Sequence, residues 1–221
     1  MKIFYPEQYA DSVIDIDYEA LYRAGVRLIL FDVDNTLATY NRALPEPRIQ
    51  ALIQRLKEQG FEIVLVSNGG EHRVERFAAA LGVHYVYRGM KPLPSGIRRV
   101  LQQRNVRKKE AVLVGDQVVT DVWAGKWAGS LTVLTRPIST VDDEWITKIK
   151  RGLEGRVIAS YLKKEGKKQK EEEKKKGRKK KRGKGRGERG GGRGEGKGRG
   201  RGGGGGGEKR GGGGGREREG K

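Results

Sequence analysis

The sequence contains no cysteine, and this absence excludes several kinds of chemistry at once. Without thiols the chain has no disulfide, no zinc site built on thiolates and no cysteine nucleophile. It also has no apolar run that approaches the length of a membrane span. The first residues lack the long uncharged core of a secretory signal. We therefore expect a cytoplasmic protein, either soluble or peripheral at the inner face of the membrane.

Apolar residues become scarce after Leu162. Residues 163–221 hold 25 Lys plus Arg against 9 Glu, a net charge of +16 out of +20 for the whole chain. A charged segment rich in glycine cannot bury enough apolar surface to offset the entropy lost on ordering. The sequence predicts a folded domain over residues 1–162 and a disordered basic tail over residues 163–221. The first segment is long enough for one α/β domain with its own core.

One stretch, Leu28 to Leu37, joins a short apolar run to two carboxylates that follow it directly. An apolar run without polar alternation predicts a strand that is buried on both faces of a parallel sheet. Asp32 and Asp34 then lie at the carboxyl end of that strand, where open α/β sheets bind ligands. The alternative is that residues 34–36 simply begin a turn.

The rest of the predicted domain alternates apolar runs with amphipathic segments. Strands are expected at residues 63–66, 83–87, 111–114 and 131–134, and helices at residues 18–24, before Gly60, before Gly82, at residues 95–103 and before Gly129. This rhythm predicts a doubly wound, Rossmann-like parallel sheet. Trp123 and Trp127 lie one helical turn apart, and we expect them to pack in the core.

Polar residues follow four of the predicted strands, and they are Asp32 with Asp34, Ser67 with Asn68, Lys91, and Asp116 with Asp121. The carboxyl ends of parallel strands share one edge of the sheet, so these side chains should lie close together. Several carboxylates with a lysine and a hydroxyl suit phosphoryl transfer, in which a carboxylate can attack phosphorus and oxygen ligands can hold Mg²⁺. Two simpler interpretations stay open: Thr120 and Asp121 as a helix N-terminal cap and its dipole partner, and Lys91 as a solvated lysine.

The same residues carry a family resemblance. The motifs Asp32-Val-Asp34-Asn-Thr36, Ser67-Asn68, Lys91-Pro92 and Gly115-Asp116-(x)4-Asp121, in that order, resemble the four motifs of the haloacid dehalogenase (HAD) superfamily phosphatases across the whole predicted domain. The opening around Tyr5-Pro6, the residues after Ser67-Asn68 and residues 115–122 are similar to the YqeG-type class IIIA phosphatases. Those phosphatases are in turn similar to the mitochondrial phosphatidylglycerophosphate phosphatases of eukaryotes.

The resemblance implies a role for each carboxylate. Asp32 is then the nucleophile, and Asp34 is the general acid/base that protonates the leaving alkoxide and later activates water. Asp34 would also offer its main-chain carbonyl to Mg²⁺. Asp116 would be a direct or water-mediated ligand of the metal, and Asp121 would orient the shell of ligands around it.

The resemblance also implies a phosphate-binding set. Ser67, Asn68 and Lys91 match the family's positions for the phosphate oxygens. The sequence departs from the expected pattern at Gly69-Gly70, where further polar residues would be typical. This departure weakens any substrate role for that loop.

The spacing between motifs leaves no room for a cap domain, because 32 residues separate Asp34 from Ser67 and 23 separate Ser67 from Lys91. An uncapped site is open to a lipid head group or a phosphorylated macromolecule. The resemblance favours phosphatidylglycerophosphate as the substrate of a Mg²⁺-dependent phosphomonoester hydrolase. The alternatives are a soluble or nucleic-acid phosphomonoester, or a nucleic-acid-binding protein in which the HAD domain is an idle scaffold.

Two features favour contact with anionic partners. An apolar helical stripe is formed by Trp145, Ile149, Leu153, Val157 and Tyr161, with Lys148, Lys150, Arg151 and Arg156 on other faces. Such a helix is typical of binding to an anionic membrane, although the stripe can equally pack against the sheet. The Arg-Gly repeats of residues 183–201 lack the aromatic residues that stack on bases, which predicts nonspecific, salt-sensitive binding to polyanions.

Overall fold

The computed structural model describes residues 2–87, 89, 91–139 and 154–167. The chain divides into two compact units, Met1–Lys170 and Glu171–Lys221. The second unit lies outside the described residues, and so does most of the predicted tail. The predictions of disorder and of polyanion binding for that segment therefore stay predictions.

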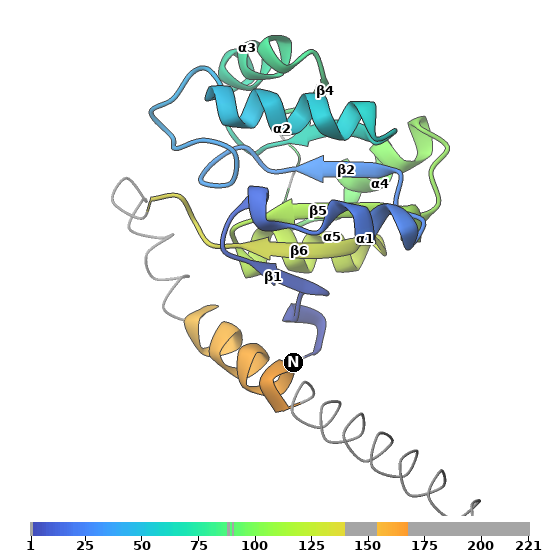
Figure 1. Cartoon of the computed structure of the whole chain (residues 1–221), viewed down its shortest axis with the longest axis vertical. Helices are drawn as coiled ribbons and strands as arrows, with labels where there is room; N and C mark the ends of the chain where they lie inside the picture. The colour runs from blue at the N-terminus through green and yellow to red at the C-terminus, as the bar shows by residue number, and fades with distance from the viewer. Residues whose placement is uncertain (1, 88, 90, 140–153, 168–221) are drawn as a thin grey trace, which may run out of the picture. The chain divides into compact units, whose positions relative to one another are not determined.

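Six parallel strands form the single sheet of the first unit, in the order β1-β6-β5-β2-β3-β4 (Figure 1). The strands are β1 (Gln8–Ala10), β2 (Leu28–Phe31), β3 (Glu62–Val66), β4 (His84–Val86), β5 (Ala111–Gly115) and β6 (Leu131–Thr135). The chain order reverses between β2 and β5, which pair directly with Leu30 opposite Leu113. Such a switch point is where doubly wound sheets bind ligands, and the predicted α/β class is confirmed.

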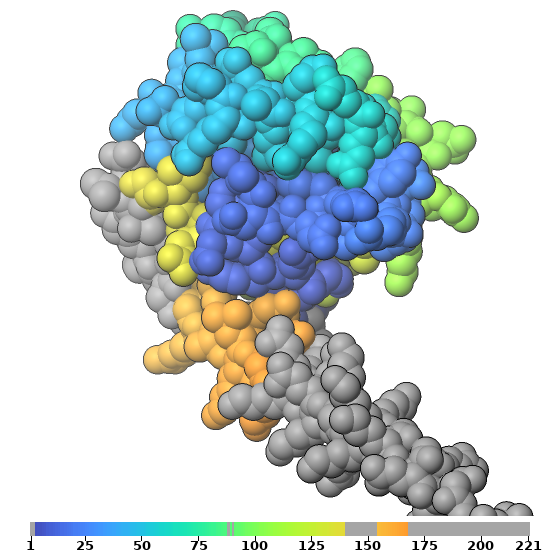
Figure 2. Space-filling view, in the orientation of Figure 1, coloured from blue at the N-terminus to red at the C-terminus, as the bar shows by residue number. Residues whose placement is uncertain are grey.

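Helices cover both faces of the sheet. They are α1 (Tyr18–Arg23), α2 (Pro47–Glu58), α3 (Glu71–Leu81), α4 (Ser95–Gln103) and α5 (Trp123–Ala128), joined by the 3₁₀ turns η1 (Lys2–Phe4), η2 (Val13–Asp15) and η3 (Lys108–Glu110) and the π-helical turn η4 (Val118–Val122). Strand β2 feeds a core on each face, with Ile29 and Phe31 under α1, α2 and α3 and with Leu28 and Leu30 under α4 and α5. Figure 2 shows the first of these faces, covered by the blue and cyan segments. The continuous apolar run of β2 in the sequence predicts this burial on both faces of the sheet.

The segment between Asp34 and Ser67 holds one loop, helix α2 and strand β3. All of its residues are described, and no domain is inserted among them. Helix α2 ends at Glu58, and Gly60 with φ +93° turns the chain back into β3. This segment therefore places no cap domain over the carboxyl ends of β2 and β3, as the spacing predicted.

The core packing predicted for the two tryptophans is wrong for Trp127, which is 44% exposed. Trp123 and Trp127 stack on each other with ring centroids 5.8 Å apart. Helix α5 instead turns Ala124, Gly125 and Ala128 toward the sheet. A Cβ on Gly125 would stand 2.5 Å from Cγ2 of Thr132, so glycine is what lets the helix lie close to β6. A helix seated this closely on small residues has no room for indole rings beneath it.

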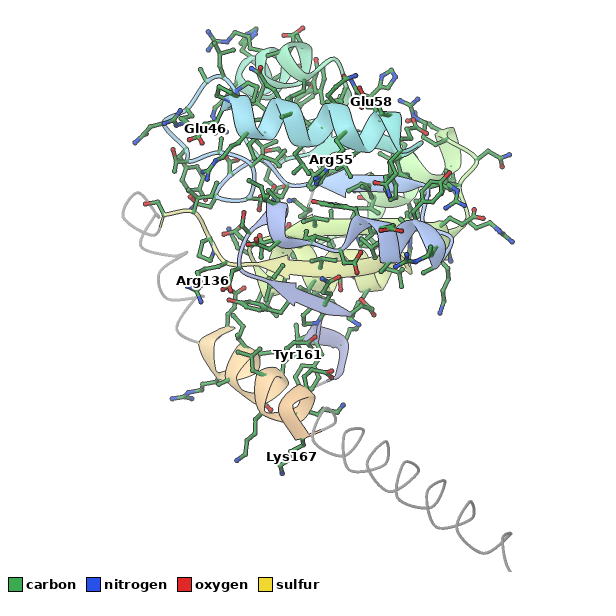
Figure 3. The ribbon with its side chains drawn as sticks, viewed as in Figure 1. Glu46, Arg55, Glu58, Arg136, Tyr161 and Lys167 are labelled. Carbon is green, nitrogen blue, oxygen red and sulfur yellow. The ribbon has the colours of Figure 1, made fainter. Side chains whose placement is uncertain are left out.

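A further helix spans residues 154–167 and continues five residues past the predicted domain end at Leu162. Its Glu154 is buried and accepts a hydrogen bond from the N–H of Val119 in η4 at 2.9 Å. Tyr161 is also buried, and its ring meets that of Tyr5 edge to face at 5.8 Å. In Figure 3 the labelled Tyr161 lies on the side of the helix toward the domain and Lys167 on the outer side.

The described part of the apolar stripe therefore contacts the domain. Val157 packs with Val118, Val122 and Leu134, as the second interpretation of the stripe predicted. The remaining residues of that prediction, Trp145, Ile149 and Leu153 with Lys148, Lys150 and Arg151, lie outside the described residues. Among the residues that the structure describes, no helix has the length and apolar content needed to cross a bilayer.

Candidate active site

The seven residues singled out from the sequence all lie beyond the carboxyl ends of strands. Asp32 and Asp34 follow β2, Ser67 and Asn68 follow β3, Lys91 follows β4, and Asp116 and Asp121 follow β5. Four of them, Asp32, Lys91, Asp116 and Asp121, meet at the switch point between β2 and β5. Asp34 lies beside Ser67 instead, and Asn68 contacts the backbone of Lys91.

Lys91 is the cation at the centre of the four. Its Nζ donates hydrogen bonds to Oδ1 of Asp32 at 2.6 Å and to Oδ1 of Asp121 at 2.7 Å. The side chain is only 3% exposed, which excludes a solvated lysine. Burial alone would lower the pKa of the Lys91 ammonium, but Asp121 and Asp32 outweigh it and raise that pKa above its ordinary value. Lys91 is therefore charged at neutral pH.

Asp121 does not act as the cap of α5. One of its oxygens accepts from Lys91, and the other accepts from the N–H of Gln117 at 3.0 Å. A Cβ on Gly115 would stand 2.3 Å from Cγ of Asp121, so the last residue of β5 must be glycine for this carboxylate to lie where it does. The fourth motif therefore needs glycine at residue 115 for a steric reason.

Three buried carboxylates form a candidate metal site. One oxygen from each of Asp32, Asp116 and Asp121 lies within 4.8 Å of the others. The hydroxyl of Thr36 lies between two of them, 3.5 Å from Asp32 and 3.4 Å from Asp116. Burial, opposed by Lys91 and reinforced by the neighbouring carboxylates, raises the pKa of Asp32 well above its usual range.

Charge and ligand type indicate what would fit this site. Three carboxylates lie together in a buried place, and two of them contact the ammonium of Lys91. All of the donors are hard oxygens, which is the set that Mg²⁺ and similar divalent cations take. The residues present therefore fit a hard divalent cation.

Asp34 lies outside that cluster and has its own partners. Its Oδ2 accepts from the hydroxyl of Ser67 at 3.3 Å, and its Oδ1 accepts from the guanidinium of Arg73. Arg73 also donates to the carbonyl of Thr39 at 3.0 Å. Arg73 belongs to the residues after Ser67-Asn68 that carry the YqeG-type resemblance, but no role was predicted for it. The feature of the sequence that could have pointed to Arg73 is its place in the first turn of a helix that begins at the carboxyl edge of the sheet.

Asn68 binds the backbone of Lys91 through its side chain. Its Nδ2 donates to the carbonyl of Lys91 at 2.8 Å, and its Oδ1 accepts from the N–H of Lys91 at 3.1 Å. Both ends of the amide are thus used on one residue of a neighbouring loop. Asn68 fixes the backbone from which the lysine side chain reaches the carboxylates.

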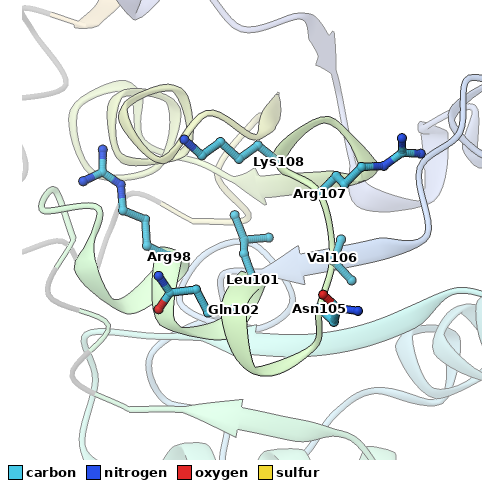
Figure 4. A pocket seen from close by; sticks show the side chains of 7 residues that line it. All are labelled: Arg98, Leu101, Gln102, Asn105, Val106, Arg107 and Lys108. Atoms are coloured by element: carbon cyan, nitrogen blue, oxygen red, sulfur yellow. The ribbon is translucent and has the colours of Figure 1, made fainter.

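A cavity of about 690 Å³ lies away from this edge (Figure 4). It is lined by Arg98, Leu101, Gln102, Asn105, Val106, Arg107 and Lys108, at the end of α4 and the turn that leads into β5. Arg98 donates to the carbonyl of Trp127 at 2.8 Å, and Arg107 pairs with Glu110. No residue predicted from the motifs lines it, so the candidate active site is the cluster at the carboxyl edge.

Comparison with known proteins gives the family. Residues 40–129 match the family described as haloacid dehalogenase-like hydrolase. The chain is 33% identical over 165 residues to "Probable phosphatase YqeG" of Bacillus subtilis, covering 75% of this chain and 95% of that protein. It is 30% identical to phosphatidylglycerophosphate phosphatase 1, chloroplastic/mitochondrial, of Arabidopsis thaliana over 67% of this chain and 45% of that protein. The chloroplastic protein of that name from Chlamydomonas reinhardtii is 28% identical over 67% of this chain and 59% of its own length.

Proposed function

Because the chain belongs to the YqeG-like phosphatases of the haloacid dehalogenase-like hydrolase family, we propose that it hydrolyses a phosphomonoester through an aspartyl-phosphate formed on Asp32. The observation that carries this proposal is the contact of Asp32 with Lys91 beside two further buried carboxylates. A nucleophilic carboxylate needs a nearby cation to bring a phosphate dianion close, and the cluster supplies one.

The proposed reaction has two steps. An oxygen of Asp32 attacks phosphorus while the ester P–O bond breaks, and Asp34 gives a proton to the leaving alkoxide. Asp34 then takes a proton from a water molecule, which attacks the phosphorus and restores the Asp32 carboxylate. The hydroxyl of Ser67 and the ammonium of Lys91 bind the phosphate oxygens, and Asn68 acts by fixing the backbone of Lys91.

Asp32, Asp116 and Asp121, with the main-chain carbonyl of Asp34, would hold Mg²⁺. When bound, the cation would offset the carboxylate charge that otherwise repels the phosphate. The three buried carboxylates, whose oxygens lie within 4.8 Å of one another, support a divalent ion.

Mg²⁺ is expected to stabilise the folded protein. At a concentration 100 times its Kd, a ligand that binds only the folded state adds about 2.7 kcal/mol. For a chain of this size that raises Tm by roughly 5–10 °C. Thermal unfolding of wild type with and without Mg²⁺ measures this shift, and Asp116→Asn should lose most of it. Asp11→Asn, at an exposed ion pair with Arg136, is the matched control and should keep the full shift. An equal shift in all three proteins would contradict the proposed site.

We further propose phosphatidylglycerophosphate as the substrate, at the cytoplasmic face of a membrane. Two relatives carry the name of that activity. The loops at the carboxyl edge also expose apolar side chains that suit the surface of a bilayer: Leu44 before α2 (59% exposed), Leu93 before α4 (45%) and Ile138 after β6 (44%). An uncapped site with an apolar rim can reach a head group without extracting the lipid.

The substrate proposal is tested by comparing kcat/KM on different phosphomonoesters in the presence of Mg²⁺. We expect phosphate release from phosphatidylglycerophosphate in mixed micelles to exceed release from soluble sugar and nucleotide phosphates by about tenfold or more, because about 1.4 kcal/mol of extra contact suffices for that ratio. Higher kcat/KM on the soluble set would contradict the lipid assignment and leave the phosphatase chemistry in place.

The basic tail supports a second candidate function, nucleic-acid binding with the phosphatase domain idle. The same assay separates the two candidates if it includes a chain that ends at Lys167, which keeps the whole described helix of residues 154–167. Hydrolysis that survives this truncation favours the phosphatase. Absence of hydrolysis by the full chain, together with nucleic-acid binding that is lost on truncation, favours the alternative.

A further inference from the structure

Two basic side chains contact different carboxylates of the candidate active site. Lys91 contacts Asp32 and Asp121 in the buried cluster. Arg73, from the first turn of α3, contacts Asp34. The side chain of Asp34 is thereby held apart from the three carboxylates that could share a cation. The carboxylate assigned to proton transfer thus has its own support, from a helix that the other carboxylates do not touch.

Arg73 links three segments of the chain. Nη1 of its guanidinium donates to Oδ1 of Asp34, and Nη2 donates to the carbonyl of Thr39, five residues further along the loop that follows β2. The second oxygen of Asp34 accepts from Ser67, whose own oxygen accepts the N–H of Gly69 at 2.9 Å. The Arg73 and Asp34 side chains are only 21% and 13% exposed. A planar fork with both nitrogens engaged fixes orientation in a way that a mobile surface pair does not.

Gly69 provides the space for this arrangement. A Cβ at residue 69 would stand 3.1 Å from Oδ2 of Asp34 and 3.1 Å from Oγ of Ser67, with Arg73 Nη1 at 3.8 Å. Such contacts are tighter than side chains ordinarily make, so a larger residue would displace Asp34 or Ser67. The departure from the family pattern at this position therefore has a local explanation: the glycine leaves room for the paired carboxylate.

We propose that Arg73 is a positioning residue for Asp34, holding that carboxyl group where it gives its proton to the leaving alkoxide as the ester P–O bond breaks and the bond from Asp32 to phosphorus forms. The inference rests on the proposed function, and it adds a residue to which neither the motifs nor the comparisons give a role. Its consequence is selective. In the first step, in which Asp32 attacks phosphorus, Arg73 matters when the leaving group needs a proton and matters little when it does not.

The test compares two leaving groups in Arg73→Gln. An alkyl phosphomonoester, the best of those found in the substrate comparison, leaves as a basic alkoxide that needs protonation. The activated ester p-nitrophenyl phosphate leaves as a stable phenolate. The quantity compared is kcat/KM, because it reports formation of the aspartyl-phosphate and not the later attack of water. A misplaced acid can cost about 10²-fold, so we expect kcat/KM to fall by about that factor on the alkyl ester and by less than about threefold on the activated ester.

Arg76→Gln is the matched control, because Arg76 is an exposed arginine of the same helix. It should leave kcat/KM on both esters unchanged. Equal losses of kcat/KM on both esters in Arg73→Gln would indicate general damage to the fold or to phosphate binding and would overturn the inference alone, as would an unchanged kcat/KM on the alkyl ester. A wild-type protein that hydrolyses neither ester would overturn the proposed function, and the inference with it.

Discussion

Asp32→Asn is expected to lower kcat for phosphate release by about 10⁴-fold or more, the scale seen when a covalent nucleophile is removed. The amide is nearly the same shape as the carboxyl but cannot attack phosphorus. The fold should survive the change, because the amide fills the same space and Lys91 keeps its ion pair with Asp121. The loss would therefore report on chemistry and not on unfolding.

The measurement is a rapid acid quench with a phosphate-labelled ester, followed by counting label on the protein. Wild type should show transient labelling, and Asp32→Asn should show none. Asp34→Asn is the informative partner: with p-nitrophenyl phosphate the first step needs no proton, so label should accumulate because water is not activated in the second step. Label on Asp32→Asn protein would show that another residue is the nucleophile. Circular dichroism of each variant confirms that it is folded.

The strands that position the site could be predicted because each is an uninterrupted apolar run. Residues of β2 and β5 are buried on both faces, and a run without alternation is the pattern that such burial produces. Strand β1 was missed because it has three residues, with partners that come from β6 more than 120 positions later. Its strand character depends on that pairing and not on a local preference.

The sequence allowed a prediction of which strand ends supply residues to the site, but not of which side chains contact one another there. Parallel topology brings residues 32, 67, 91 and 116 to one edge whatever the loops do. Which side chains pair is decided by loop conformation, so the contacts of Arg73 with Asp34 and of Asn68 with Lys91 could not be derived. The same holds for Gly69 and Gly115, because their requirement for glycine depends on how closely Asp34 and Asp121 approach.

Lys91→Met is expected to lower the free energy of unfolding by about 3–5 kcal/mol in the absence of divalent cation. Methionine has a similar length but no charge, so the buried carboxylates of Asp32, Asp116 and Asp121 lose the ammonium that partly balances them. Removing one partner of a buried ion pair leaves an uncompensated charge, and a loss of this size is typical. For a chain of this length Tm should fall by roughly 10–15 °C.

Denaturant unfolding of wild type and Lys91→Met, each with and without Mg²⁺, distinguishes lost charge from lost packing. Lys126→Met is the control, since its ion pair with Glu7 lies at the surface and its loss should cost less than about 1 kcal/mol. If charge is the cause, Mg²⁺ should restore part of the stability of Lys91→Met, because a cation in the cluster replaces the missing positive charge. Hydrolysis should stay low in that rescued protein, because the ammonium proposed to bind the phosphate oxygens is still absent. A Lys91→Met protein as stable as wild type would contradict the stabilising role assigned to the contacts of the Lys91 ammonium with Asp32 and Asp121.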